Sequence, residues 1–211
     1  MRKIIILLIL FIFLISSASA ATLTVPSTSY KTVQSAINAA KHNDTVSVKS
    51  GIYNENLIVT QKRVNLIGEQ YKYPKILGIS TSNGGCINLN GFNVTKSGIW
   101  LNDAGANLIR NNYIYTKGVN VAYPSSTNTV MNNKFFNCGI GLYESYENSV
   151  TGNTISKASE GLGLHEGATC KTITGNTFSC CKIGVSCWTV PLCLTGNTYK
   201  GNTVNIKTGV Y

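Results

Sequence analysis

The sequence predicts an all-β fold, a parallel β-helix in which a short unit of chain winds repeatedly around one axis. A six-residue phrase recurs five times and ends in asparagine at steps of 21, 20, 23 and 21 residues, at 107–112, 128–133, 148–153, 171–176 and 192–197. A shorter phrase that begins with glycine accompanies it, at 98–101, 118–121, 139–142, 161–164 and 184–187. Self-similarity at a fixed period of this length is typical of a solenoid.

The residues inside each unit indicate which solenoid it is. Apolar and polar residues alternate in short bursts, as at Ile99 and Leu101 or Val119 and Val121, which is the period of a half-buried strand. No unit contains the longer 3.6-period segment of a leucine-rich or helical repeat. Asn, Gly, Ser and Thr separate the bursts and favour tight corners. Each unit is therefore a coil of short strands joined by turns.

The asparagine that ends each phrase is expected to form a ladder along the stack. Equivalent residues of adjacent coils lie about 4.8 Å apart, one strand spacing. Inward-facing asparagines at this distance exchange side-chain amide hydrogen bonds and so satisfy groups that would otherwise be buried without partners. We interpret the ladder as structural, and its members are Asn112, Asn133, Asn153, Asn176 and Asn197.

The first twenty residues have the pattern of a cleavable secretion signal. Arg2 and Lys3 precede twelve apolar residues at 4–15, and Ala18-Ser19-Ala20 matches a cleavage site. Twelve apolar residues are too few to span a bilayer, and no second apolar run of spanning length follows. We therefore expect residues 21–211 to form one secreted β-helix domain without a membrane span.

Residues 31–41 predict a short amphipathic helix ahead of the coils. Val33, Ala36, Ile37 and Ala40 form one apolar stripe, which suits a cap over the open end of the first coil. Strands at 45–67 and 75–95 together with the five repeats predict about seven coils. Only 207–211 remain after the last strand, too little for a second capping helix.

The entry to the coils resembles a known family. Thr32-Val-Gln-Ser-Ala-Ile-Asn-Ala-Ala40, Asn43-Asp-Thr-Val-Ser-Val48, Gly51-Ile-Tyr-Asn-Glu-Asn56 and Val64-Asn-Leu-Ile-Gly68 resemble the start of pectin-lyase-like right-handed β-helix proteins. The later repeats are similar to those of the nitrous-oxide reductase maturation factor. The resemblance covers about residues 28–206 and implies a right-handed, single-stranded β-helix. It does not imply one function, because this fold carries many.

The net charge points to an anionic environment. Residues 21–211 contain 16 Lys and Arg against eight Asp and Glu, a net charge of +8. Such an excess favours acidic polysaccharide, nucleic acid or lipid headgroups as partners. The lysines are scattered without a basic run or basic helix, so we expect no nucleic-acid partner.

Seven cysteines in a secreted chain imply disulfides, and an odd number leaves at least one thiol unpaired or joined to another molecule. Cys170 and Cys193 occupy nearly matching places in successive coils and are a candidate bridge. Cys187 replaces an inward leucine and is interpreted as a buried apolar residue. The remaining candidates for disulfides within or between chains are Cys86, Cys138, Cys180 and Cys181.

The resemblance also indicates where chemistry is expected. Enzymes of the resembled superfamily use carboxylates on the outer face of the coils, but the aspartate clusters of its polygalacturonases, pectate lyases and pectinesterases are absent here. Asp103, Glu144 and Glu166 nevertheless follow their phrase glycines at the same offset. Glu144 and Glu166 on neighbouring coils would lie about 5 Å apart, near the separation of a retaining glycosidase pair.

The residues just before this acidic edge suggest a sugar-binding strip. Tyr143, His165 and Trp188 each stand one position earlier than the edge in their coils. Their rings suit sugar faces, and His165 would assist Glu144 and Glu166 in catalysis. The alternative interpretation is a solvated row of turns with lysine counterions.

The sequence also contains two glycosylation patterns but few candidate metal ligands. Asn43-Asp-Thr45 and Asn93-Val-Thr95 match the glycosylation acceptor pattern. We expect no metal or other cofactor, because there is no Cys-x-x-Cys motif and His42 lies far from His165 in the sequence. Scarce methionine likewise disfavours copper handling by analogy with the maturation factor.

Two functions are compatible with these observations. The first is a non-catalytic, self-associating component of an extracellular surface layer or sheath, similar to the β-helix surface and sheath proteins of some archaea. Its partners would be further copies or other surface-layer proteins. The second is a carbohydrate-binding protein, or a polysaccharide lyase or hydrolase, that acts on an acidic polysaccharide.

Overall fold

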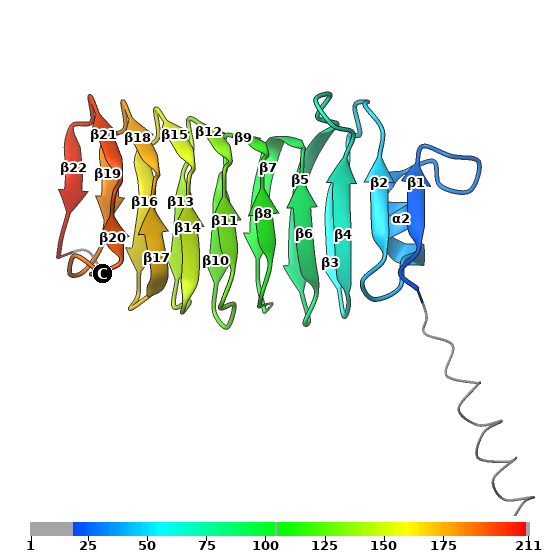
Figure 1. Ribbon diagram of the computed structural model, residues 1–211, viewed down its shortest axis with the longest axis horizontal. Coiled ribbons are helices and arrows are strands. Elements are labelled where there is room, and N and C mark those ends of the chain that lie inside the picture. Colours follow the sequence, from blue (N-terminus) through cyan, green and yellow to red (C-terminus); the bar gives the residue numbers. More distant parts are fainter. Residues whose placement is uncertain (1–18, 104, 210–211) are drawn as a thin grey trace, which may run out of the picture.

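A computed structural model describes residues 19–103 and 105–209, which form one continuous parallel β-helix (Figure 1). The predicted secretion signal lies outside the described residues, apart from residues 19 and 20. No helix in the described ranges is both long and apolar enough to cross a membrane.

One wall of the β-helix is a parallel sheet with nine strands in the described residues. In spatial order the strands are β1 (Thr22–Val25), β2 (Thr45–Val48), β4 (Arg63–Gly68), β6 (Cys86–Asn90), β8 (Leu108–Arg110), β11 (Thr129–Met131), β14 (Asn148–Thr151), β17 (Cys170–Thr174) and β20 (Leu194–Thr195). Each strand belongs to the coil that follows the coil of its neighbour, so every coil contributes one strand, or rung, to this sheet.

The second sheet has 13 strands in the described residues and divides at a long strand, β7 (Asn93–Leu101). Before the division lie β3 (Asn56–Thr60) and β5 (Lys75–Ser82). One branch contains β9 (Tyr113–Tyr115), β12 (Lys134–Phe136), β15 (Thr154–Ser156), β18 (Thr177–Ser179) and β21 (Thr198–Lys200). The other contains β10 (Val119–Ala122), β13 (Ile140–Tyr143), β16 (Glu160–His165), β19 (Ile183–Ser186) and β22 (Val204–Lys207). Later coils therefore have three walls.

The coil count predicted from the sequence is too low: the structure has nine rungs in the described residues instead of about seven. The prediction overlooked β1, which pairs with β2 although it precedes the helix. It also treated 45–67 as one coil, whereas β2 and β4 pair with each other as successive rungs. Strand pairing that skips the intervening helix leaves no periodic trace in the sequence.

The N-terminal end of the stack is covered by a short helix, α2 (Val33–Ala39). The Thr32 side chain accepts a hydrogen bond from the Ser35 N–H and so begins the helix, as N-cap residues do. Val33, Ala36 and Ile37 are buried against the first coils. At the opposite end of Figure 1, β20, β21 and β22 are the last strands of the described stack.

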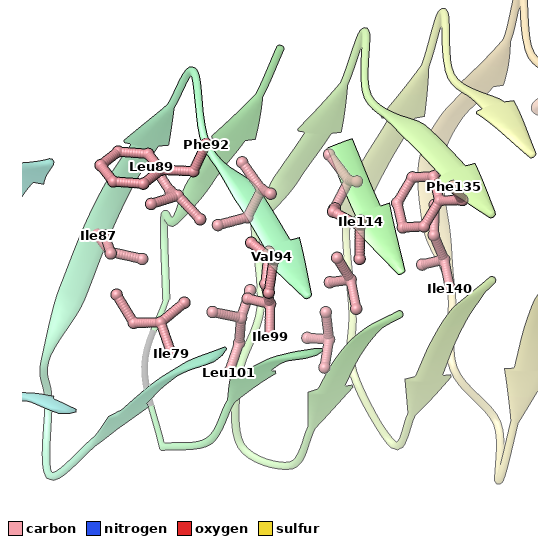
Figure 2. Close-up of a cluster of buried hydrophobic side chains, with 14 of the residues drawn as sticks. Ile79, Ile87, Leu89, Phe92, Val94, Ile99, Leu101, Ile114, Phe135 and Ile140 are labelled. Carbon is pink, nitrogen blue, oxygen red and sulfur yellow. The ribbon is translucent and has the colours of Figure 1, made fainter. Parts of the chain in front are cut away.

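The interior is a single hydrophobic core that runs the length of the stack. Inward residues alternate with outward ones, and the largest fully buried side chains are Phe92, Phe135 and Phe178. Figure 2 shows how successive coils contribute equivalent residues, such as Ile79 and Ile99, which pair in register, to this column. Each coil buries its apolar side chains against those of the coils on either side, so no single coil encloses a core by itself.

The five asparagines that end the sequence phrases are joined along the stack, and all are buried except Asn197, which is partly buried. Each side-chain Nδ2 donates to Oδ1 of the next, at 3.0 Å for Asn112 to Asn133, 3.1 Å for Asn133 to Asn153, 3.0 Å for Asn153 to Asn176 and 2.9 Å for Asn176 to Asn197. The Oδ1 atom of Asn133 also accepts the Asn112 backbone N–H at 3.0 Å, and its Nδ2 also donates to Ile109 O at 2.9 Å. This ladder therefore satisfies both side-chain and backbone polar groups at a buried corner.

A second ladder, which was not predicted from the sequence, uses the first asparagine of the phrase. Asn107 donates to Asn128 at 2.8 Å, and Asn128 donates to Asn148 at 3.0 Å. Asn148 then donates to Ser145 Oγ at 3.1 Å. The signal was present as the repeated asparagine at 107, 128 and 148.

We expect Asn133→Ala to lower the free energy of unfolding by about 3 kcal/mol, because it leaves several buried donors and acceptors without partners. Asn120→Ala is the matched control, since Asn120 is partly exposed and among the described residues its side chain donates to Lys117 O alone, at 3.2 Å. We expect the control to change the free energy by about 0.5 kcal/mol or less. Urea unfolding followed by circular dichroism measures both. Equal losses would show that the ladder adds no stability.

Candidate functional site

The acidic edge predicted from the sequence lies at one corner of the stack. Strand register pairs Tyr143 with His165, so Glu144 and Glu166, the residues that follow them, occupy the same turn in neighbouring coils. Asp103 occupies the corresponding turn two coils before Glu144. All three acidic residues are exposed and have positive φ, 49° at Asp103, 44° at Glu144 and 54° at Glu166. The structure therefore brings the three acids to one edge.

Nothing in the described structure orients these carboxylates. Neither Glu144 nor Glu166 has a side-chain hydrogen bond or ion pair there, and the Glu144 backbone N–H donates to His165 O at 3.3 Å. A glycosidase pair requires one carboxyl to be held as a proton donor, usually by a desolvated or charged environment. Side chains that extend freely into water do not supply this environment.

The aromatic residues beside the edge form an outward-facing column. The rings of Tyr143 and His165 are stacked with centroids 4.9 Å apart and an interplanar angle of 16°. Register places Trp188 next along the same column, with 51 % of its surface exposed. Burial raises the pKa of Tyr143, and the negative charges of Glu160 and Glu166 raise it further.

A carboxylate that was not predicted from the sequence completes this cluster. Glu160, at the start of β16, bonds His165 Nε2 through Oε2 at 2.8 Å. Its other oxygen accepts a hydrogen bond from Ser186 Oγ. Glu160, and not Glu144 or Glu166, is therefore the carboxylate that holds the imidazole. Its position just before a phrase glycine was the available signal, but the equivalent positions in other coils, such as Lys117 and Cys138, are not acidic.

Two glycines make room for the cluster on the outer face. A Cβ at Gly141 would lie 2.6 Å from the Tyr143 ring, and one at Gly163 would collide with both Glu160 and His165. Any side chain at these positions would displace the rings from the sheet. The Gly141–Gly163 pairing therefore allows the rings to lie flat over the backbone.

A shallow groove adjoins this cluster on the side of the preceding coils. Its volume is about 190 Å³, and residues 139–141 are among those that line it. The polar side chains that line it include Lys117, Asn120, Asn137 and Glu160. An ammonium, two amides and a carboxylate beside a tyrosine ring can bind a polyhydroxylated ligand.

The structure brings Cys170, Cys187 and Cys193 to one cavity and places the other four cysteines elsewhere. No disulfide joins any of them in the described residues, which contain all seven. Cys170 and Cys193 lie near enough for the charge of one to affect the other, and both line a cavity with Cys187. Their bridge remains a prediction. Cys138 and Cys181 are buried, Cys86 is partly buried and Cys180 is exposed.

The two predicted glycosylation positions differ in accessibility. Asn43 lies exposed in the turn before β2 with φ of 69°. Asn93 lies on β7, is partly buried, and donates from Nδ2 to Tyr73 O at 3.1 Å. In the folded chain only Asn43 therefore presents its amide nitrogen to a glycan.

The fold and these outward-facing clusters define a β-helix repeat protein. A sequence profile described as "Periplasmic copper-binding protein (NosD)" matches residues 34–210, and the chain belongs to this family. No curated protein and no solved structure matches it.

The family description implies copper, but the donors in the described residues do not fit a preformed copper site. No three His, Cys, Asp or Glu side chains converge there. His42 Nδ1 accepts a hydrogen bond from the Arg63 backbone N–H at 3.3 Å. His165 lies several coils away from His42 and bonds Glu160. Imidazole and soft sulfur donors are the ligands that copper prefers. The two histidines lie in distant coils, and the three thiols around one cavity, those of Cys170, Cys187 and Cys193, are not grouped so that they could hold a metal ion.

We expect buried thiols to react more slowly than exposed ones. It raises the pKa of Cys138 to about 11 and that of Cys170 to about 12, so at pH 8 well under one in a hundred of either is thiolate. With reduced protein and maleimide we expect exposed Cys180 to react first, and Cys138 and Cys170 to react more slowly. Peptide mass spectrometry locates the label, and labelling in urea is the control in which all seven react. Labelling of Cys138 as fast as Cys180 would contradict the described burial.

Proposed function

We propose that the protein is a non-catalytic structural solenoid on the outer side of the cytoplasmic membrane, and that it self-associates into a surface layer or sheath. Membership of a family described as periplasmic supports this location. The observation that carries the proposal is the difference between the two ends of the described stack.

The N-terminal end has a cover, whereas the last described coil has none in the described residues. α2 buries Val33, Ala36 and Ile37 over the first coils. At the other end, within residues 19–103 and 105–209, β20, β21 and β22 each pair with strands of the preceding coil alone. A parallel strand with one free edge offers N–H and C=O groups to another chain, and natural proteins usually cover such edges.

The side chains of the last strand fit the same interpretation. Val204 and Ile206 of β22 are 38 % and 37 % exposed, although their equivalents Ile183 and Val185 in the coil before are partly or fully buried. A further copy that pairs with this edge would bury them. A contact between the end of one copy and a different surface of the next propagates and builds fibres or sheets.

Charge is expected to modulate this association. The net charge of +8 on residues 21–211 opposes contact between copies, and salt screens repulsion between exposed charges. Association through backbone and apolar groups should therefore strengthen as the salt concentration rises.

We expect the mature protein to form oligomers at high concentration without reductant, and Ile206→Lys to weaken their association at least tenfold, because a charge on an edge strand opposes pairing. Tyr146→Lys is the control, since it adds the same charge to a turn in the middle of the stack where Tyr146 is 46 % exposed. Sedimentation velocity over a concentration and salt series measures association. A mature chain that stays monomeric throughout would eliminate self-association.

A second candidate function is supported by the stacked Tyr143 and His165 rings and the adjoining polar groove. In this alternative the chain binds an acidic polysaccharide. Lysine side chains pair with the carboxylates of its uronic acids, and Glu144 and Glu166 catalyse its cleavage. It requires Glu144 or Glu166 to take up an oriented position when the polymer is bound.

If the chain is a lyase or hydrolase, Glu144→Gln and Glu166→Gln should each lower turnover at least a hundredfold while the fold is retained. The assay is the release of unsaturated or reducing ends from polygalacturonate and other acidic polysaccharides. Glu147→Gln is the control, because Glu147 is also an exposed carboxylate but lies three residues further along the chain, outside the acidic edge. No release by the unaltered protein would eliminate this activity.

A further inference from the structure

The loop between β19 and β20 exposes apolar side chains to an unusual extent. Trp188 is 51 % exposed, Val190 is 52 % exposed and Leu192 is 99 % exposed. Three of the eleven large hydrophobic residues that are exposed in the described structure lie in this one loop, between 188 and 192. A cluster of this kind marks an interaction surface more often than scattered single residues do.

The loop is not simply the outer layer of the core. A cavity of about 500 Å³ lies beneath it, lined by Leu164, Cys170, Cys187 and Cys193 together with loop residues. Leu192 therefore does not pack on a filled core, and its side chain has no polar group that water would solvate. Its removal from water would be favourable wherever a partner supplies an apolar medium.

The charge around the loop has one sign. Residues 167–209 contain four lysines, Lys171, Lys182, Lys200 and Lys207, and no aspartate or glutamate. Lys171 follows Cys170 of the cavity wall, and Lys207 pairs with Ser186 just before the loop. Both lysines are exposed. A partner at this surface must therefore accept apolar side chains and carry negative charge.

We propose that residues 188–193 dock the protein peripherally on an anionic lipid surface. Tryptophan and aliphatic side chains enter the boundary between headgroups and acyl chains, while nearby lysines are attracted to anionic headgroups. An acidic polysaccharide matches the lysines and can stack on Trp188, but it offers no apolar medium for Val190 and Leu192. The lipid surface is the partner that uses all of these residues.

This inference goes beyond the structural role proposed above and uses other side chains. Self-association rests on the edge of β22 with Val204 and Ile206, whereas lipid docking rests on the loop at 188–193 and on nearby lysines, of which only Lys207 also belongs to β22. A change at Leu192, which lies outside β22, therefore tests lipid docking without altering the strand edge.

The test is flotation of the exported, leader-free protein with vesicles of phosphatidylglycerol and phosphatidylcholine, and with vesicles of phosphatidylcholine alone. Mass spectrometry verifies that the apolar leader is absent, because it would bind lipid by itself. We expect binding to the anionic vesicles and at least tenfold weaker binding to the neutral ones. Trp100→Phe leaves Trp188 as the sole tryptophan, and its emission should shift to the blue when anionic vesicles are added.

Variants separate the two contributions. Leu192→Ser should weaken binding about tenfold, because a whole leucine side chain is lost from the interface. Lys171→Gln and Lys207→Gln should each weaken it about fivefold and reduce its salt dependence. Ile52→Ser is the control, since Ile52 is 71 % exposed at the opposite end of the stack and should leave binding unchanged. Circular dichroism and melting verify the fold of each variant.

Three results would overturn the proposal. The first is failure of the unaltered protein to float with anionic vesicles. The second is an effect of Leu192→Ser no larger than that of Ile52→Ser. The third is binding to soluble polygalacturonate that competes fully with the vesicles and does not depend on Leu192, which would assign the surface to an acidic polysaccharide.

Discussion

In-register stacking of the coils is the constraint on which the rest of the structure depends. Every strand pairs in parallel with its equivalent one coil away, so each position along the unit becomes a column. An inward column must be apolar or, like the two asparagine ladders, must satisfy its own polar groups. A column of close backbone approach must be glycine: a Cβ at Gly139 would collide with the carbonyl oxygens of Glu160 and Gly161. The phrases repeat in the sequence because every coil must meet these requirements at the same positions.

The same constraint leaves the outer face free to vary, and the candidate sites lie where one coil departs from its neighbours. Glu160 and His165 meet over a glycine that other coils replace with Asn120 or Ser186. The apolar loop at 188–193 likewise occurs in the last full repeat and has no counterpart in the coil before it. Function in this fold is therefore sought in exceptions to the repeat, because the repeat itself accounts for stability.

Family membership and the observed donors lead to different conclusions about copper. The match to the family extends over residues 34–210 and accounts for the coils themselves. Its description names copper, yet the histidines of this chain are in distant coils and no three metal-binding side chains converge in the described residues. Proteins that share this fold therefore need not share metal ligands. The fold depends on the residues that face the core, whereas ligands are bound by residues that face outward.

The sequence alone determined the parallel β-helix, the strand alternation and the asparagine column, because each of these is a property repeated at a fixed period. It also placed Glu144 and Glu166 at one corner, since a common offset from the phrase glycine fixes the column. It did not yield β1, whose partner lies beyond α2, or the bond between Glu160 and His165, which depends on how two side chains bend back over Gly163. Only the tertiary structure decided these features, because contacts across coils and side-chain directions have no period in the chain.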